Sequence, residues 1–239
     1  MNQTSHPAQQ PEQSPSKISL QSPLSTVKRG AKRAAYDQQT VHQIIDESLI
    51  CHIAQQQNGK LFVTPTCHWR DGEYLYWHGH SRARNVHDSA ADDQREGQQV
   101  CINLCLLDGL VLARSAFHHS VNYRSVTLFG VPEWIEDADE KARQLKNMVD
   151  KISPQRWQQL RPMTDTELKA TGVVRVRIDQ ASAKVRNGDP IDDEADLDWP
   201  VLAGVLPLQR QWGELEIAAD FQLDAAAPEL ARPLAPAAF

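Results

Sequence analysis

The feature that most constrains the fold is a series of short β-like segments joined by glycine turns. Apolar and β-branched residues are concentrated in residues 49–55, 60–70 and 73–79, with Asn-Gly at 58–59 and Asp-Gly at 71–72 between them. Both dipeptides tolerate positive φ, which tight hairpin turns require. The three segments therefore predict an antiparallel meander.

Further strands follow along the chain. Residues 99–107 are apolar on both faces, which predicts a strand that is buried on both sides and offers a partner surface. Residues 121–136 read as a long strand interrupted at Gly130 and Pro132, with a bulge expected there, and residues 172–186 supply the last β segments. We therefore predict a mainly β fold, a β-barrel with peripheral helices.

Two helices have clear start signals. Asp37 is expected to cap a short helix that contains Val41 and Ile44 at helical spacing. Asp137 and Glu140 form a capping-box pattern before an amphipathic segment that ends at Pro154. We place both helices at the periphery of the sheet.

Length and composition favour one domain with two tails. The chain has 239 residues. Residues 1–27 are rich in Gln, Ser and Pro and predict a disordered tail, whereas residues 224–239 are a low-complexity Ala/Pro/Leu segment. Residues 28–223 are then the folded domain.

Charge, cysteines and hydropathy exclude several classes. The formal net charge of −6 argues against a nucleic-acid partner, because such binding needs a basic surface. The four cysteines lie within apolar β-like segments, as reduced thiols of cytosolic proteins do. No apolar run is long enough for a membrane helix, and the polar start lacks a secretory signal. We expect a cytoplasmic protein that does not bind membranes.

The sharpest local feature is the junction at residues 79–84, Gly-His-Ser-Arg-Ala-Arg. It predicts a strand end followed by a helix capped by Ser81, where free N–H groups favour an anion. Arg82 and Arg84 can clamp a phosphate in bidentate fashion. The alternative is a solvated basic helix start.

A second polar cluster covers residues 118–125. Strand alternation places Tyr123 and Ser125 on one face and Asn122 and Arg124 on the other. The cluster predicts either a portion of a ligand site or a structural network at the strand ends. Metal binding is not expected, because the His-x-His pair at 78–80 is followed by arginines rather than a carboxylate.

Several ordered blocks resemble a known family. They are residues 33–37, LYWHGHSRAR (75–84), LDGLVLARSAFHHSVNYRSVTLFG (107–130) and SAKVRNGDPIDDEAD (182–196). Together, from about residue 28 to 215, they resemble the pyridoxamine 5′-phosphate oxidase-related, flavin-nucleotide-binding proteins. The resemblance implies a six-stranded antiparallel FMN-binding split barrel, paired into a homodimer with FMN, or alternatively FAD, along the subunit boundary.

The resemblance also implies a set of cofactor-binding residues. They are His78, Ser81, Arg82 and Arg84 beside the flavin phosphate and ribityl chain, Tyr123, Arg124 and Ser125 on a neighbouring wall, and Lys184 as a further contact. It implies a flavin-dependent oxidoreductase of unknown substrate, with no catalytic acid or base assigned, and not vitamin B6 oxidation itself. The alternatives are a non-enzymatic flavin carrier or sensor and a haem-binding split barrel.

Overall fold

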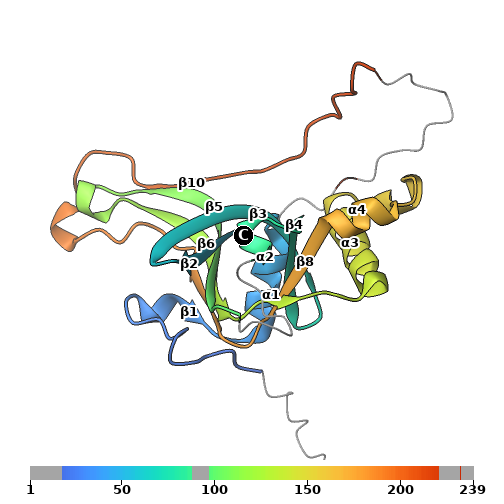
Figure 1. Cartoon of the computed structure of the whole chain (residues 1–239). Helices are drawn as coiled ribbons and strands as arrows, with labels where there is room; N and C mark the ends of the chain where they lie inside the picture. The colour runs from blue at the N-terminus through green and yellow to red at the C-terminus, as the bar shows by residue number, and fades with distance from the viewer. Residues whose placement is uncertain (1–17, 88–96, 221–231, 233–239) are drawn as a thin grey trace, which may run out of the picture.

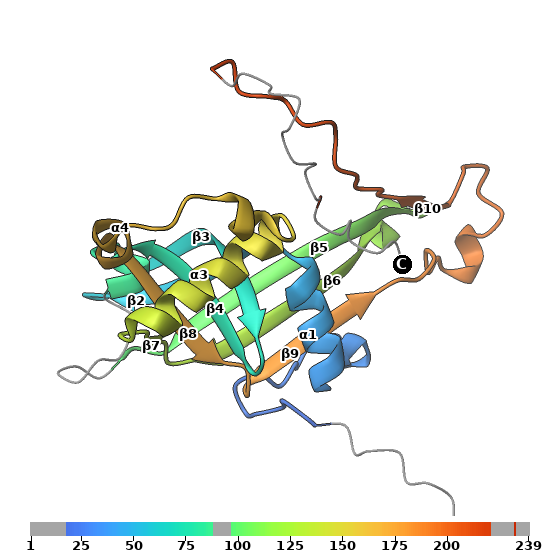
Figure 2. The same cartoon turned by 90° about the vertical axis from the view of Figure 1, so that its right-hand side faces the viewer.

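The computed structural model describes residues 18–87, 97–220 and 232. Their backbone forms one ten-stranded antiparallel sheet that curls around a core, with helices against it (Figures 1 and 2). The strands are β1 (Ala34–Ala35), β2 (Ile50–Gln57), β3 (Lys60–Asp71), β4 (Tyr74–His80), β5 (Val100–Leu112), β6 (Ser120–Gly130), β7 (Glu133–Trp134), β8 (Thr171–Arg177), β9 (Ala181–Arg186) and β10 (Gly204–Pro207). The α-helices are α1 (Gln38–Glu47), α2 (Arg84–His87), α3 (Ala138–Ile152) and α4 (Asp165–Ala170).

The strand order defines an open split barrel. Neighbouring strands follow the order β1-β9-β6-β5-β2-β3-β4-β8-β7, and β10 pairs with β5. Within the described residues the two ends of this order, β1 and β7, do not pair with each other. The predicted mainly β split barrel is thus confirmed. The sheet has ten strands rather than the six predicted: β1, β7 and β10 are short additions, and seven longer strands remain.

The glycine turns form as the sequence predicts. Strands β2, β3 and β4 pair in succession, which confirms the antiparallel meander. Asn58 and Gly59 have φ of 50° and 74°, and Gly72 has φ of 56°. These φ angles lie in the left-handed region, which Gly and Asn adopt at a lower energetic cost than most other residues. The two dipeptides therefore fix the turns of both hairpins.

The long strand β6 stops where the sequence indicates. It ends at Gly130, and a Cβ there would lie 2.4 Å from Cγ2 of Val176, so any side chain would collide with β8. The predicted bulge lies elsewhere: the register between β5 and β6 shifts between Leu107 and Gly109. Glycine at 130 therefore allows close strand approach rather than a bulge.

Strand β5 has one side uncovered within a single chain, on the segment where the sequence predicts a partner surface. Its side chains alternate between buried and more exposed positions, with Leu104 and Leu106 buried and Cys105 and Leu107 exposed. The strand is therefore buried on one side only in this chain. We call the side that faces the main hydrophobic core the inner face of the sheet and the opposite side the outer face.

Helix α1 closes one end of the inner core. Asp37 caps it as predicted, because its carboxylate accepts a hydrogen bond of 3.0 Å from the Thr40 backbone N–H. Val41, Ile44 and Ile45 are buried in the same cluster as the inner-face residues of the strands. The amphipathic pattern of this segment thus directs its apolar side into the barrel.

Helix α3 lies across the outer face of β3, β4 and β8 (Figure 2). Asp137 caps it by accepting a bond from the Glu140 N–H at 2.7 Å. Beneath it, Trp69 and Tyr76 stack with 5.8 Å between ring centroids, and Leu145 packs in the same cluster. We call this region of the sheet the covered face.

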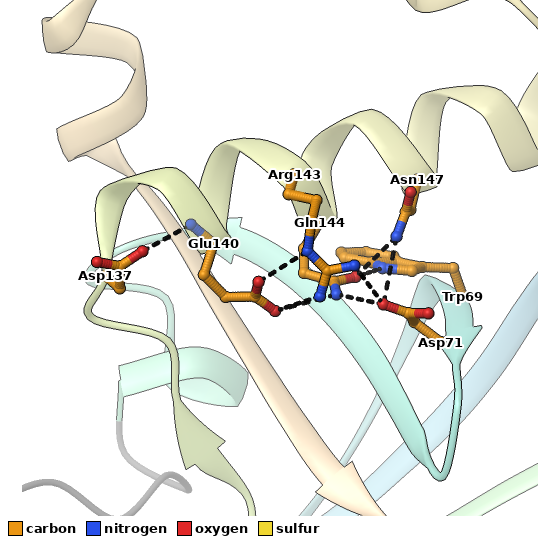
Figure 3. Close-up of polar contacts among 7 residues, drawn as sticks. All are labelled: Trp69, Asp71, Asp137, Glu140, Arg143, Gln144 and Asn147. Carbon is orange, nitrogen blue, oxygen red and sulfur yellow. Dashed lines mark hydrogen bonds and ion pairs between the residues drawn. The ribbon is translucent and has the colours of Figure 1, made fainter.

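Polar contacts fix α3 to β3 (Figure 3). The indole Nε1 of Trp69 donates to Oε1 of Gln144 at 2.8 Å, and the Gln144 amide donates to Asp71 at 2.8 Å. Arg143 forms salt bridges of 2.8 Å with both Asp71 and Glu140. Because Gln144 is fully buried, these bonds satisfy a polar group that would otherwise be costly in the core.

The N-terminal segment differs from the predicted tail where it is described. Leu20 is buried in the main core, so residues 18–27, assigned to the N-terminal tail, include an ordered contact with the domain. The predicted boundary at residues 223–224 lies outside the described residues. No helix in the described chain is long and apolar enough to cross a membrane.

Candidate functional site

The predicted phosphate site lies at the end of β4. His78 is half-buried on the outer face, and its ring centroid lies 6.1 Å from that of Trp69. Burial lowers the pKa of His78. Its Nδ1 has no hydrogen-bond partner among the described residues, so the imidazole retains a free polar atom at the border of the covered face.

The turn after β4 is built differently from the prediction. Helix α2 begins at Arg84, so Ser81 is not its N-cap. Instead the Ser81 N–H donates to the Ala170 carbonyl at 2.8 Å, and the Arg82 N–H donates to Nδ1 of His80 at 3.1 Å. These local bonds hold residues 80–83 as a turn. The exposed Arg82 side chain remains available.

A second group of predicted residues lies on β6 and β9. Tyr123 and Ser125 are half-buried on the outer face, as alternation predicts. Ser125 is directly opposite Lys184 of β9 and Cys105 of β5. The Lys184 ammonium donates to the Arg29 carbonyl at 3.3 Å. These side chains share one outer surface and are spatially adjacent.

Arg124 occupies a different environment. It is 2% exposed and points to the inner face, where Nε and Nη2 donate to the two carboxylate oxygens of Asp108 at 2.9 Å each. Nη1 also bonds to Glu47 at the end of α1. A bidentate pair plus a second carboxylate offsets the guanidinium charge, so this geometry supports the structural alternative for Arg124.

The two groups do not meet within one subunit. Strands β4 and β6 are four positions apart in the sheet, which at the usual spacing is roughly 19 Å along the surface. One phosphate therefore cannot contact both groups of the same subunit. Cofactor contacts from both would require a long ligand or a second copy of the chain.

A pocket of about 740 Å³ opens between these groups. Its floor is the outer face of β2 and β5, and its rim comes from the ends of α1 and α3 and from residues 210–212. The lining residues are Asp46, Glu47, Ser48, Leu49, Ile50, His52, Asn103, Cys105, Leu106, Asp150, Lys151, Pro154, Arg210, Gln211 and Trp212. None of them belongs to the predicted cofactor-binding set.

Lys151 ties the two helices at the rim. Its ammonium donates to the carbonyls of Ser48 at 2.7 Å and Ile45 at 3.3 Å, which lie at the end of α1. Burial lowers the pKa of Lys151 to about 8. The lysine thus caps free helix carbonyls from the neighbouring helix.

Sequence reasoning missed this pocket because its walls come from four distant segments. The one local signal is His52, an imidazole on the exposed side of an otherwise alternating strand. Among the described residues no group of three or more His, Cys, Asp or Glu side chains is arranged to hold a bare metal ion.

The strand order is that of a split barrel. A family profile described as pyridoxamine 5′-phosphate oxidase matches residues 37–185. The chain belongs to this family. No curated protein sequence matches it.

Two solved structures are similar over most of the chain. The flavocytochrome Anf3 from Azotobacter vinelandii is 42% identical, with 87% of this chain and 94% of that one covered and a TM-score of 0.81. The FAD and haem binding protein from Mycobacterium smegmatis is 31% identical, with 82% and 94% covered and a TM-score of 0.76. Both have the same fold over nearly their whole length.

Proposed function

We propose that this protein binds a flavin nucleotide and acts in electron transfer, as a flavin-dependent oxidoreductase. The observation that carries the proposal is the 42% identity, over 87% of the chain, to a protein described as a flavocytochrome. The family resemblance leads us to expect FMN. The description of the Mycobacterium smegmatis protein as FAD-binding favours FAD, and we propose FAD with FMN as the alternative.

The flavin phosphates belong at the turn after β4. Arg82 is exposed there, Arg84 follows at the start of α2, and Ser81 and His78 flank the turn. These residue types fit the group, because guanidinium and hydroxyl donors match phosphate oxygens and His78 has an unpartnered Nδ1. Bound there, the flavin supplies the redox chemistry, and the chain supplies anchoring and orientation.

Tyr123, Ser125 and Lys184 complete the site in a homodimer. They lie too far along the sheet from Arg82 to share a phosphate within one subunit, but a second copy can bring them to it. The exposed apolar side chains on the same outer surface support this pairing. They are Leu107, Leu110, Leu112 and Val121. The cysteines are all free thiols, which fits a reducing cytoplasm.

The absorbance spectrum of the freshly purified protein tests flavin binding. We expect a yellow protein that releases FAD or FMN on heating, and chromatography identifies which. Reduction of the bound flavin by NADH or NADPH separates an enzyme from a carrier or sensor. A colourless protein that does not quench added flavin fluorescence would contradict the proposal.

Variants locate the phosphate. Replacing Arg82 with Ala removes charge-assisted bonds worth about 1.5–3 kcal/mol each, so we expect flavin affinity to fall by roughly tenfold to a hundredfold. Arg177→Ala, an exposed arginine on β8, is the matched control and should change affinity little. Equal affinities of the two variants would remove Arg82 from the site.

Haem binding is a second candidate function. One observation favours it: the Azotobacter vinelandii protein is described as a flavocytochrome, and the Mycobacterium smegmatis protein is described as binding haem. Haem and flavin would then occur in one chain and have to occupy different places.

A further inference from the structure

We propose that the 740 Å³ pocket binds haem and that His52 is the axial ligand to its iron. This inference rests on haem as the second candidate function and assigns it a place and a ligand. The pocket volume lies within the roughly 300–1,000 Å³ of typical cofactor sites.

The walls match a flat apolar macrocycle. The apolar residues of the lining are Leu49, Ile50, Leu106, Pro154 and Trp212, of which Leu106 is buried on the inner face. Trp212 and Ile50 also have exposed surface that a ligand would cover. Burying such apolar surface favours binding.

His52 is the side chain in this lining best suited to bind iron. It lies on the outer face of β2, opposite Asn103 in the register with β5. Within the described chain its imidazole has no hydrogen-bond, ionic or ring partner, so both nitrogens are available. A single histidine commonly holds haem iron in proteins.

The other donors in the pocket are less suitable. The Asn103 amide already donates to the Val126 carbonyl and to Thr127 Oγ1, at 3.1 Å each. Burial raises the pKa of the Cys105 thiol, which disfavours the thiolate that would bind iron. His52 is therefore the donor in this lining whose side chain has no other contact among the described residues.

The charges of the lining suit a dianionic ligand. Lys151 and Arg210 place two cations in the lining, where Lys151 donates to the carbonyls of Ser48 and Ile45 and Arg210 donates to that of Leu107. The three carboxylates of the lining are each paired with a cation: Asp46 with Arg70, Glu47 with Arg124 and Asp150 with Lys146. Their negative charge is thus largely offset before an anion arrives.

The test is a titration of hemin into the purified full-length protein, followed by its Soret band. We expect saturable binding of one hemin per chain. His52→Ala should weaken hemin affinity by at least roughly tenfold and change the band position, since the iron loses its protein ligand. In His52→Gly, added imidazole should restore the wild-type band.

Two histidines outside the pocket provide controls. His87→Ala, in α2, and His119→Ala, before β6, should leave the Soret band unchanged. Loss of the band in either control but not in His52→Ala would overturn the assignment, as would an unchanged spectrum in His52→Ala. A wild-type protein that does not take up hemin would overturn the whole inference.

A second variant tests the pocket without changing His52. Ile50→Trp should fill the cavity from the same face of β2 and lower hemin uptake while far-UV circular dichroism stays native. Full hemin uptake by this variant would place haem elsewhere. Flavin absorbance in the same samples separates the two proposals. Protein that binds flavin but not hemin contradicts only this inference. Protein that binds hemin but not flavin contradicts only the proposed flavin site.

Discussion

The outer surface of the sheet has two regions that share a strand pattern but differ in what lies on them. On the covered face, Trp69 and Tyr76 are 1% and 3% exposed beneath α3. On β2, β5 and β6 the equivalent alternating positions are exposed or half-buried, as at Cys105 and Leu107. We call this second region the open face.

The difference shows that one region of the outer surface contributes to the core, whereas the other remains accessible for binding. Alternation decides only which side chains point outward. Whether an outward position becomes core depends on a helix brought there by chain connectivity. The candidate sites follow this division, since the pocket lies on the open face and His78 lies at the border between the two.

The largest expected effect is on the covered face. Trp69→Ala removes a buried, stacked and hydrogen-bonded indole, so we expect the free energy of unfolding to fall by about 3–5 kcal/mol. Urea denaturation measures it. The matched control is Trp199→Ala, since Trp199 is 63% exposed and its loss should cost less than about 1 kcal/mol. Equal losses would mean that α3 does not build a core.

Arg124 tests whether a predicted site residue is structural. Arg124→Ala leaves Asp108 and Glu47 without their shared cation, which should lower the free energy of unfolding by about 3 kcal/mol. Denaturation with and without flavin measures both roles. A variant that keeps wild-type stability but loses flavin affinity would instead return Arg124 to the cofactor site.

The hairpin turns, the cap at Asp37 and Arg124 show what the sequence could and could not predict. The hairpins at Gly59 and Gly72 and the cap at Asp37 depend on neighbours within a few residues, so they were predictable. The sequence also placed Arg124 on the face opposite Tyr123. Its partner Glu47 is 77 residues away, however, and no local pattern carries that information.

The candidate site also has one part that the sequence could predict and one part that it could not. The strand–turn junction at Arg82 was visible because its elements are consecutive. The start of α2 was predicted too early in the chain, since the His80 ring takes the Arg82 N–H and closes a turn instead of a helix. The pocket was not predictable, because residues near 50, 104, 151 and 211 meet only in the folded chain.

The loss of stability at acid pH tests a titratable side chain of the inner core, His68, rather than either region of the outer surface. Burial lowers the pKa of His68 to about 3, and its Nε2 lies 3.0 Å from the Ile45 carbonyl. The folded state therefore holds this imidazole neutral, so its contribution is complete above pH 6.5 and is lost as pH falls toward 3. The slope is at most about 1.4 kcal/mol per pH unit.

His68→Gln isolates this contribution, because the amide can still donate to the carbonyl but does not titrate. Urea midpoints measured between about pH 7 and pH 4 should fall less steeply in the variant than in the wild type. Parallel curves for the two proteins would show that His68 does not titrate in this window.

The smallest effect on stability is expected on the open face. Leu107→Ser and Leu110→Ser replace exposed side chains, so the free energy of subunit unfolding should change by less than about 0.5 kcal/mol. The same substitutions should shift a dimer toward monomer in light scattering. The exposed Leu61→Ser on β3 is the control. A wild-type protein that is monomeric and still binds flavin would overturn the shared site.

The bridge made by Lys151 has a consequence for how the pocket responds to a guest. Because one ammonium fastens the last turn of α3 to the carbonyls that end α1, the mouth of the pocket is braced before anything enters. A braced mouth has little freedom left to lose on binding, which favours affinity through preorganisation. It also makes the pocket selective by size, since a bulkier guest would have to push α1 and α3 away from each other.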